Sequence, residues 1–498
     1  MSRLDPRTPV LVGVGQVTDR GGEADPLGLM TAAARLAAED AVAGDALLRR
    51  PDRVAVAAVD VFSWPVPDPG ALVAAELGIA PRETVRSVIG GNGPLALLAD
   101  LASRIAAGEL ETALIVGGEV VTRFRRAMAA GEPTGWPTQP DGTAPTRLVG
   151  VDRPPSHPVE QAAGVLLPAT YYPLFEHALR RVAGRTTEEQ RRWIASWWAR
   201  YSEVAASDEH AWHREPMSAE QVAVTGPGNR PISDPYPRSM IADITVDQAA
   251  ALLLTSAGAA EAAGVPRDRW VFPHASAAAH DHWFVAERER LDRSPAIAAI
   301  GGALRARTGT DAGDWGPVDL YSCFPCAVQI AARELGFAEE DLARPLTVTG
   351  GLRFFGGPAN DYATHALARL VERLRAAPDA VGLSTAVGWH MTKHAAVLLG
   401  ARPPARPYGH DDVQDAVDAG PRRQVVEPGP GDWTVETFTV AHDRAGEPSA
   451  GIVVALDGAG RRTVARSDDP ATAARLLDDD PIGQPVELAG SAGVALGA

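Results

Sequence analysis

Two separate stretches of the chain share one pattern, and this pattern constrains the fold more than any other feature. Residues 87–118 read SVIGGNGPLALLADLASRIAAGELETALIVGG, and residues 347–385 read TVTGGLRFFGGPANDYATHALARLVERLRAAPDAVGLST. Each stretch runs from an apolar strand through a glycine turn into an amphipathic helix and then into a second apolar strand. The similarity predicts an internal duplication of one α/β unit.

Strands and helices also alternate around these two units, which predicts an α/β fold with buried, two-sided apolar strands. In the first half, PVLVGVGQV and VAVAAVDVFSW are expected strands, and residues 27–43 and 69–79 are expected helices. In the second half, SPAIAAIGGALRA, PCAVQIAARELG and residues 359–376 are expected helices, whereas VDLYSCF, LTVTGG and AVGLSTAVG are expected strands.

The composition changes at two places, and these changes set the expected domain boundaries. Residues 123–235 are rich in proline and glycine and read as an inserted, mostly helical region, in which Trp193, Trp197 and Trp198 favour core or lid packing. After the proline-rich linker ARPPARPYG, hairpin strands predict a small β domain. The expected units are therefore residues 1–122 with 236–272, the insert 123–235, residues 273–401, and residues 408–498.

Length and charge exclude several classes of protein. A chain of 498 residues is too long for one core. Its formal net charge of −16 argues against a nucleic-acid or membrane-surface partner, since both need a basic face. No signal peptide or long apolar run is visible, so a cytoplasmic protein is expected. The two cysteines, Cys323 and Cys326, are too few for a disulfide framework or a structural zinc site.

The glycine turn at residues 90–93 points free backbone N–H groups at whatever lies before the helix, which suits an anion or an oxyanion. Gly91-Asn92-Gly93-Pro94-Leu95-Ala96 also fits the GxGxxA form of the dinucleotide fingerprint. A dinucleotide fold would prefer these glycines in the first strand-to-helix turn, with an acidic residue about 20 positions later. Here the unit lies well inside the chain and the strand-end Glu119 comes late, which argues against a dinucleotide.

Four blocks within about residues 8–401 resemble the thiolase superfamily in order and spacing. The block at residues 87–118 resembles its nucleophile turn, helix and following strand, and DQAAALLLTS resembles the DGAAA segment. YSCF stands at the NEAF or HDCF motif, and GGLRFFGGP stands at GGxxxxGHP. The resemblance implies a duplicated thiolase-type α/β fold with two βαβαβ-containing halves and an inserted helical loop region. The C-terminal domain, expected to be β-barrel-like, resembles the additional domain of thiolase-like proteins of type 1.

The catalytic set of the resembled family is missing. Thiolases use a cysteine nucleophile, a histidine that activates it and a second cysteine for proton transfer. The resemblance places Gly90 at the nucleophile, Asn92 at the serine of CxSGxxA and Gly357 at the activating histidine, and STAVGWHMTKH supplies no cysteine near the last motif. An acyl-cysteine therefore cannot form at the turn. The Gly90 N–H could still polarise a thioester carbonyl.

Several side chains could replace the missing groups. Tyr321 stands at the first position of the NEAF or HDCF motif and could act as an acid or hydrogen-bond donor, or it could simply pack. Cys323 stands at the cysteine of HDCF and forms CFPC with Cys326; redox activity would require an exposed thiolate of low pKa, and two buried thiols are the alternative.

The segment WHMTKH carries two further candidates, His390 and His394, which share one face if the segment is helical. Either could act as an acid or base, but a metal would need a third ligand, so no metal is expected. Lys393 is the only lysine of the chain, which indicates either a site role or a surface position. His280-Asp281-His282 suits a metal or proton relay, although adjacent side chains point apart in regular structure.

The resemblance leaves three functions open. The first is a thiolase-like protein of the acetyl-CoA acyltransferase superfamily that acts on a coenzyme A (CoA) thioester without the cysteine nucleophile. The second is a retro-aldol lyase on a β-hydroxyacyl-CoA, with Tyr321 and His390 sharing the roles of base and oxyanion donor. The third is a non-catalytic protein that binds CoA or acyl-CoA.

The expected partner is a small acyl-CoA, with no cofactor beyond that thioester as substrate or ligand. Its phosphates need a local cationic pocket, for which Arg230 and Arg238 in GNRPISDPYPRS are the candidates. Thiolases are usually dimers or tetramers, so a homodimer is the expected assembly, which the additional domain could alter.

Overall fold

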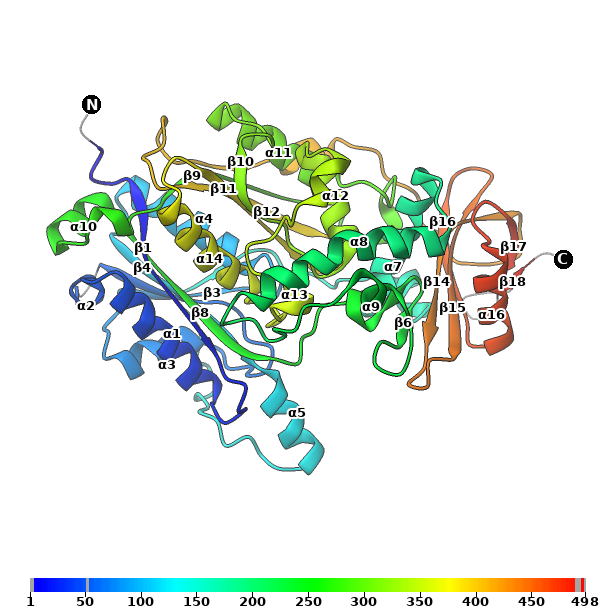
Figure 1. Cartoon of the computed structure of the whole chain (residues 1–498), viewed down its shortest axis with the longest axis horizontal. Coiled ribbons are helices and arrows are strands. Elements are labelled where there is room, and N and C mark those ends of the chain that lie inside the picture. The colour runs from blue at the N-terminus through cyan, green and yellow to red at the C-terminus, as the bar shows by residue number, and fades with distance from the viewer. Residues whose placement is uncertain (1–3, 51–52, 489–493, 497–498) are drawn as a thin grey trace.

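The computed structural model describes residues 4–50, 53–488 and 494–496, and its first sheet is mixed (Figure 1). The strands follow the order β1 (Pro9–Thr18), β8 (Asp247–Ser256), β4 (Thr112–Val120), β2 (Val54–Ala58), β3 (Glu83–Ser87) and β5 (Arg147–Val149). β8 runs antiparallel to both β1 and β4, whereas the strands from β4 to β5 are parallel. β8 is buried along its whole length, as its apolar sequence requires.

The second sheet has the order β10 (Trp315–Asp319), β11 (Val381–Gly388), β12 (Lys393–Gly400), β9 (Phe272–His280) and β13 (His410–Asp412). β12 is antiparallel to both of its neighbours, and the two outer pairs are parallel. The predicted mixed α/β architecture is thus confirmed.

Two helices from the duplicated units, α4 (Gly93–Ala107) and α14 (Tyr362–Ala376), lie between the sheets and contact strands of both. In α4 the buried positions Leu95, Leu98, Ala102 and Ile105 follow helical spacing, and Gly108 ends the helix in a left-handed conformation. Other helices cover the outer faces: α1 (Pro26–Asp40), α2 (Gly44–Leu48), α3 (Pro69–Leu77) and α10 (Ala257–Ala263) on the first sheet, and α11 (Pro295–Thr308) on the second. The helix α12 (Pro325–Leu335) packs against α11 and α7.

The short strand β5 pairs along the outer edge of β3. Val85 lies opposite Arg147, and Ser87 lies opposite Val149. Arg147 also binds the carboxylate of Asp100 on α4, at 2.7 Å. The edge of the first sheet is therefore occupied by a segment of the same chain.

The inserted region is helical, as predicted, and packs by its aromatic face. Its elements are α5 (Val121–Ala130), α6 (Pro158–Ala162), α7 (Pro168–Ala183), α8 (Thr187–Ala206), α9 (Ala219–Ala223), β6 (Pro231–Ser233) and β7 (Tyr236–Pro237). Trp197 and Trp198 of α8 are buried, and the Trp198 indole donates to the Ser239 carbonyl at 3.0 Å. No helix within the described ranges, including the 20-residue α8, is long and apolar enough to span a membrane.

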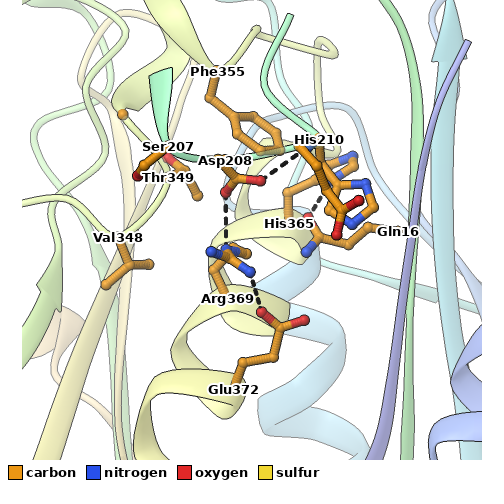
Figure 2. Close-up of polar contacts among 12 residues, drawn as sticks. Gln16, Ser207, Asp208, His210, Val348, Thr349, Phe355, His365, Arg369 and Glu372 are labelled. Atoms are coloured by element: carbon orange, nitrogen blue, oxygen red, sulfur yellow. Dashed lines mark hydrogen bonds and ion pairs between the residues drawn. The ribbon is translucent and has the colours of Figure 1, made fainter. Parts of the chain in front are cut away.

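A polar cluster joins the end of α8 to α14 (Figure 2). Asp208 forms an ion pair with Arg369 at 2.9 Å and accepts from the His210 backbone N–H at the same distance. Arg369 also pairs with Glu372 on the other side. Nearby, a ring nitrogen of His365 lies 2.8 Å from the side-chain oxygen of Gln16 on β1. The cluster thus ties the insert to the layer between the two sheets.

The C-terminal sheet lies at the far end of the molecule from α1 (Figure 1). Its order is β16 (Arg462–Ser467), β15 (Pro448–Asp457), β14 (Trp433–His442), β17 (Pro485–Leu488) and β18 (Val494–Leu496). β6 of the insert pairs with β14. The helix α16 (Pro470–Asp479) covers the sheet, and α15 (Gln414–Asp418) lies in the segment that leads to it.

The buried Arg462 joins this sheet to the second half. Its guanidinium bridges both carboxylate oxygens of Glu436, each at 2.6 Å, and donates to the carbonyls of Ala286 and Arg288. The bonds to Glu436 lie within the C-terminal sheet, whereas the fully buried Nη1 would lose both carbonyl acceptors if the two parts separated.

Two expected elements differ from the structure. Residues 346–350 form a loop in place of the predicted strand LTVTGG, because the Asp319 carboxylate accepts from the Thr347 hydroxyl at 2.9 Å and the Val348 N–H at 3.0 Å. These side-chain hydrogen bonds compete with a sheet ladder. The segment WHMTKH is a turn followed by the start of β12, so His390 and His394 do not share a helix face. A short helix, α13 (Gly351–Phe354), follows the loop.

We expect Arg462→Met to lower the free energy of unfolding by about 3–5 kcal/mol, because it leaves the Glu436 carboxylate without its partner. Arg461→Met is the matched control, since Arg461 is half exposed and its pair with Asp457 is worth less than about 1 kcal/mol. Urea unfolding of both variants measures the difference. Equal losses would show that Arg462 does not hold the C-terminal sheet in place.

Candidate functional site

The glycine turn before α4 brings the backbone into close contact with two side chains. Gly90 has a φ of +142°, and a Cβ built there would lie 2.7 Å from Oδ1 of Asn92 and 2.8 Å from Cε of Lys393. No side chain fits at this position unless Lys393 moves. The space in front of the turn is therefore occupied by an amide and an amine.

Two further glycines also allow a side chain to lie directly against the backbone. A Cβ at Gly91 would collide with the Tyr321 hydroxyl, and one at Gly388, the last residue of β11, would collide with the Asn92 side chain. The structure thus brings the turn, the loop after β10 and the start of β12 to one place. We call Gly90, Asn92, Tyr321, Asn360 and Lys393 the Gly90 site.

Asn360 occupies the N–H group that the sequence suggested as an oxyanion donor. The Gly90 N–H donates to Oδ1 of Asn360 at 3.0 Å, and Nδ2 of Asn360 donates to the carbonyl of Asp60 at 3.1 Å. Asn360 lies just before α14 and is almost fully buried. Gly357, at the position of the missing histidine, instead packs against Leu352 and Asp243.

Lys393 is buried with its amine at the turn. Nζ donates to the Ile89 carbonyl and, at 3.3 Å, to the Val151 carbonyl, and it lies 5.7 Å from the centre of the Trp389 ring. In the part of the chain that the structure describes, no carboxylate forms an ion pair with it. Burial lowers the pKa of Lys393 from 10.5 to about 8, although Asp152 and Asp60 oppose the shift.

Tyr321 and the first turn of α4 offer donors to a bound group. The Tyr321 hydroxyl forms no hydrogen bond with any described residue, and burial raises its pKa, so it stays a protonated donor. The N–H groups of Gly91 and Asn92 likewise donate to no described protein acceptor. These donors at the N-terminus of a buried helix suit a carbonyl oxygen that gains negative charge.

The turn between β11 and β12 is strained and is held by the insert. Trp389 and Met391 have φ values of +55° and +50°, which side chains rarely adopt. The hydroxyl of Tyr172 on α7 donates to the Trp389 carbonyl at 3.1 Å and accepts from the Met391 N–H at 3.3 Å. Such strain persists where the surroundings hold it, and here it fixes the start of β12, where Lys393 lies.

His390 lies in this turn and is neutral. Its ring stacks on Tyr171, with centres 3.8 Å apart, and neither ring nitrogen has a hydrogen-bond partner among the described residues. Burial lowers its pKa to about 3, and the nearby Arg288 adds to this effect. An imidazole with this pKa is a weak base near pH 7.

The two cysteines carry protonated thiols. Burial raises the pKa of the half-buried Cys323 to about 12, and it also raises the pKa of the fully buried Cys326. Sγ of Cys326 donates to the Tyr172 carbonyl at 3.4 Å. Neither environment favours the thiolate that redox or nucleophilic chemistry requires.

The remaining histidine candidates have structural partners. His394 lies 3.2 Å from Asp281, and although burial opposes ionisation, this hydrogen bond lowers the pKa of Asp281. Asp281 also accepts from Ser294 at the start of α11, while His282 bonds to the Pro421 carbonyl. His280, like Asp281 and His282, lines a cavity described below. No group of three or more metal-ligating side chains occurs in the described ranges.

The two arginines that the sequence assigned to CoA lie away from these contacts. Arg230 donates to the carbonyls of Pro231 and Asp443, and Arg238 is exposed beside Arg353. Neither forms a hydrogen bond or ion pair with the Gly90 site. Their assignment to the CoA phosphates stays a prediction.

Glu119, the acidic residue of the dinucleotide alternative, is used internally. It is almost fully buried and accepts from the Phe62 and Ser63 N–H groups and the Ser63 hydroxyl, at 2.6–2.8 Å. Burial raises its pKa to about 7. The carboxylate is not free to bind a ribose.

The site therefore combines candidate donors for an oxyanion with an amine whose pKa burial lowers to about 8, and the nearby Cys323 is a protonated thiol. The structure brings together Gly90, Tyr321 and Lys393, which the sequence singled out, and adds Asn360, which the sequence reasoning missed. The sequence drew attention to Lys393 because it is the only lysine of the chain.

Comparison with known proteins finds relatives that share the fold of this chain. The profile of the thiolase-like protein type 1 additional C-terminal domain matches residues 412–490. The chain is 30% identical to a monomeric SCP2-thiolase like protein type 1 from Mycobacterium smegmatis, with a TM-score of 0.84 over 99% of this chain and 100% of that one. No curated protein matches the chain.

More distant structures share the fold over about 80% of the chain. The Ltp2-ChsH2(DUF35) aldolase is 18% identical, with a TM-score of 0.60 over 80% of this chain and 99% of that one. Human mitochondrial 3-ketoacyl-CoA thiolase, solved in complex with CoA, is 15% identical, with a TM-score of 0.55 over 80% of this chain and 99% of that one.

The lowered pKa of Lys393 predicts how stability changes with pH. Between about pH 8 and 10.5 the unfolded chain keeps the Lys393 proton while the folded chain has lost it, so the free energy of unfolding rises with pH. We expect the wild type to gain about 2 kcal/mol relative to Lys393→Met between pH 7 and pH 10, after allowing for screening by water.

Urea unfolding at both pH values measures this difference. Arg402→Met is the control, because Arg402 is exposed and stays charged over this range, so its stability should follow the wild type. If the free energy of unfolding changed equally with pH in the wild type and in Lys393→Met, the amine would be solvated like that of an ordinary lysine.

Proposed function

The chain belongs to the SCP2-thiolase like protein type 1 family, and we propose that it binds a CoA thioester at the Gly90 site without forming an acyl-cysteine. The observation that carries the proposal is the turn before α4. Unpaired N–H groups and the Tyr321 hydroxyl stand there, while the lysine side chain takes the space that a nucleophile on residue 90 would need. A thioester carbonyl can accept from these donors, and Gly90 has no group that could attack it.

The protonation of the cysteines supports a function without acyl transfer through an enzyme thiol. Acyl transfer through an enzyme thiol needs a thiolate, and Cys323 is protonated because burial raises its pKa to about 12. We therefore expect the protein to bind acetoacetyl-CoA without cleaving it by thiolysis. The fold neighbour solved with CoA supports a CoA ligand by analogy of fold only.

We expect calorimetric titration to detect binding of both CoA and acetyl-CoA. Tyr321→Phe removes the hydroxyl that would donate to the thioester carbonyl, so it should weaken acetyl-CoA about tenfold and leave CoA unchanged, since CoA lacks the carbonyl. Tyr408→Phe is the matched control, because the Tyr408 hydroxyl bonds to Ser276 outside the Gly90 site. Absence of binding by either ligand would overturn the proposal.

The same titration tests the cationic residues proposed for the CoA phosphates. The double variant Arg230→Ala/Arg238→Ala should weaken CoA and acetyl-CoA equally, because both ligands carry the same phosphates. Unchanged affinity would remove these two arginines from the proposed site and leave the Gly90 site untouched.

A second candidate function is retro-aldol cleavage of a β-hydroxyacyl-CoA, and Lys393 favours it. A neutral amine can take the proton of the β-hydroxyl, the Cα–Cβ bond then breaks, and the donors at α4 stabilise the thioester enolate. An amine whose pKa is about 8 suits this role better than His390, whose pKa is about 3. The aldolase among the fold neighbours shows that a chain of similar fold occurs in an aldolase.

We expect wild-type protein to release a carbonyl compound and a shortened acyl-CoA from some member of a β-hydroxyacyl-CoA panel. Lys393→Met should abolish release, whereas Arg402→Met should retain it. Product formation that survives Lys393→Met would rule out the amine as the base. A panel without any product would leave acyl-CoA binding as the function.

A further inference from the structure

Lys393 lies against the turn at which the thioester is proposed to bind. Its Nζ lies 2.9 Å from the point where a Cβ of residue 90 would stand, directly beside the N-terminal turn of α4. The free N–H groups of Gly91 and Asn92 point from the same turn. A candidate nucleophile and candidate oxyanion donors thus lie at the same turn, and acyl transfer needs both near one carbonyl group.

The hydrogen bonds around the amine suit its neutral form. Two acceptors, the carbonyls of Ile89 and Val151, match the two N–H groups of a neutral amine and leave its lone pair free. No described carboxylate forms an ion pair that would hold the ammonium form. Burial lowers the pKa to about 8, so an appreciable fraction of the amine is neutral in mildly alkaline solution.

A cavity of about 350 Å³ lies beside β9, the strand next to the one that carries Lys393, and none of the residues of the Gly90 site is among its lining residues. Val151, Ala279 and His280 are among its lining residues. Val151 supplies the carbonyl that accepts from Nζ, and His280 pairs with Lys393 across β9 and β12. On the outer side Arg153 lies 5.1 Å from the centre of the Trp283 ring, and both residues line the cavity. The volume is within the range of ligand sites, and the lining combines an aromatic ring with a cation.

From this arrangement we propose that Lys393 is a self-acylation site, at which the chain accepts the acyl group of a CoA thioester onto its own amine. The proposal rests on the proposed function, because it requires the thioester to bind at the Gly90 site. The amine nitrogen forms a bond to the thioester carbon, the carbon–sulfur bond breaks, and an N–H proton ends on the CoA thiol. The products are an amide on Lys393 and free CoA.

The amide is stable, so each chain reacts once. Acylation removes the lone pair that would serve as base and places an acyl group where the free amine lay. A protein modified in this way records its exposure to acyl-CoA and loses any activity that depends on the free amine.

The composition of the chain makes the test unusually direct, since Lys393 is its only lysine. Purified full-length protein is incubated with acetyl-CoA, and intact mass, peptide mapping and released CoA thiol are measured together. We expect one acetyl group on Lys393 and an equal amount of thiol. Excess free CoA should slow the reaction by competing for the site, and Lys393→Arg should show neither product.

An internal reference separates a site-directed reaction from chemical acetylation. Arg402→Lys adds an exposed amine on the surface, because Arg402 is 69% exposed. With acetyl-CoA, Lys393 in this variant should be acetylated at least about tenfold faster than the introduced lysine. With acetic anhydride, which needs no binding site, the order should reverse, because the introduced amine is exposed and Lys393 is buried.

The outcomes distinguish the two proposals. Calorimetric binding of acetyl-CoA without acetylation of Lys393, or faster acetylation of the introduced lysine by acetyl-CoA, would overturn self-acylation and leave the proposed function standing. Absence of binding together with absence of acetylation would overturn both.

Discussion

The contact between the first turn of α4 and the start of β12 is the constraint on which the rest of the site depends. It exists because residues 90, 91 and 388 carry no side chain, so an asparagine amide, a tyrosine hydroxyl and a lysine stem can lie against bare backbone. This close packing joins the two halves at the centre of the molecule. It also excludes any side-chain nucleophile from the turn, so the same contact that completes the fold determines the available chemistry.

Burial drives most ionisable groups around this contact toward their neutral forms. It raises the pKa values of Tyr321 and Cys323 and lowers those of His390 and Lys393. A chain of net charge −16 thus surrounds its central site with groups that interact through hydrogen bonds more than through charge. In a dry environment such hydrogen bonds are stronger than in water, which suits a polarised carbonyl.

Local patterns in the sequence predicted the fold well, and contacts between distant segments limited the prediction of the site. Helix α4 forms where the sequence predicts an amphipathic helix, because the leucine spacing within it and Gly108 after Ala107 are local signals. The strand expected at LTVTGG does not form, because the carboxylate of Asp319, almost 30 positions earlier, accepts hydrogen bonds from the Thr347 hydroxyl and the Val348 N–H. Asn360 was missed for the same reason: its partner Gly90 is 270 positions away, and no spacing rule connects them.

The short strand β5 has a consequence for association between copies. An uncovered strand edge presents unpaired N–H and C=O groups that can template a strand from a second molecule. Along β3 those groups are already satisfied by Arg147–Val149, and Arg147 is itself anchored to Asp100 on α4. A second copy therefore cannot pair with β3 at Val85–Ser87 unless it first displaces this segment.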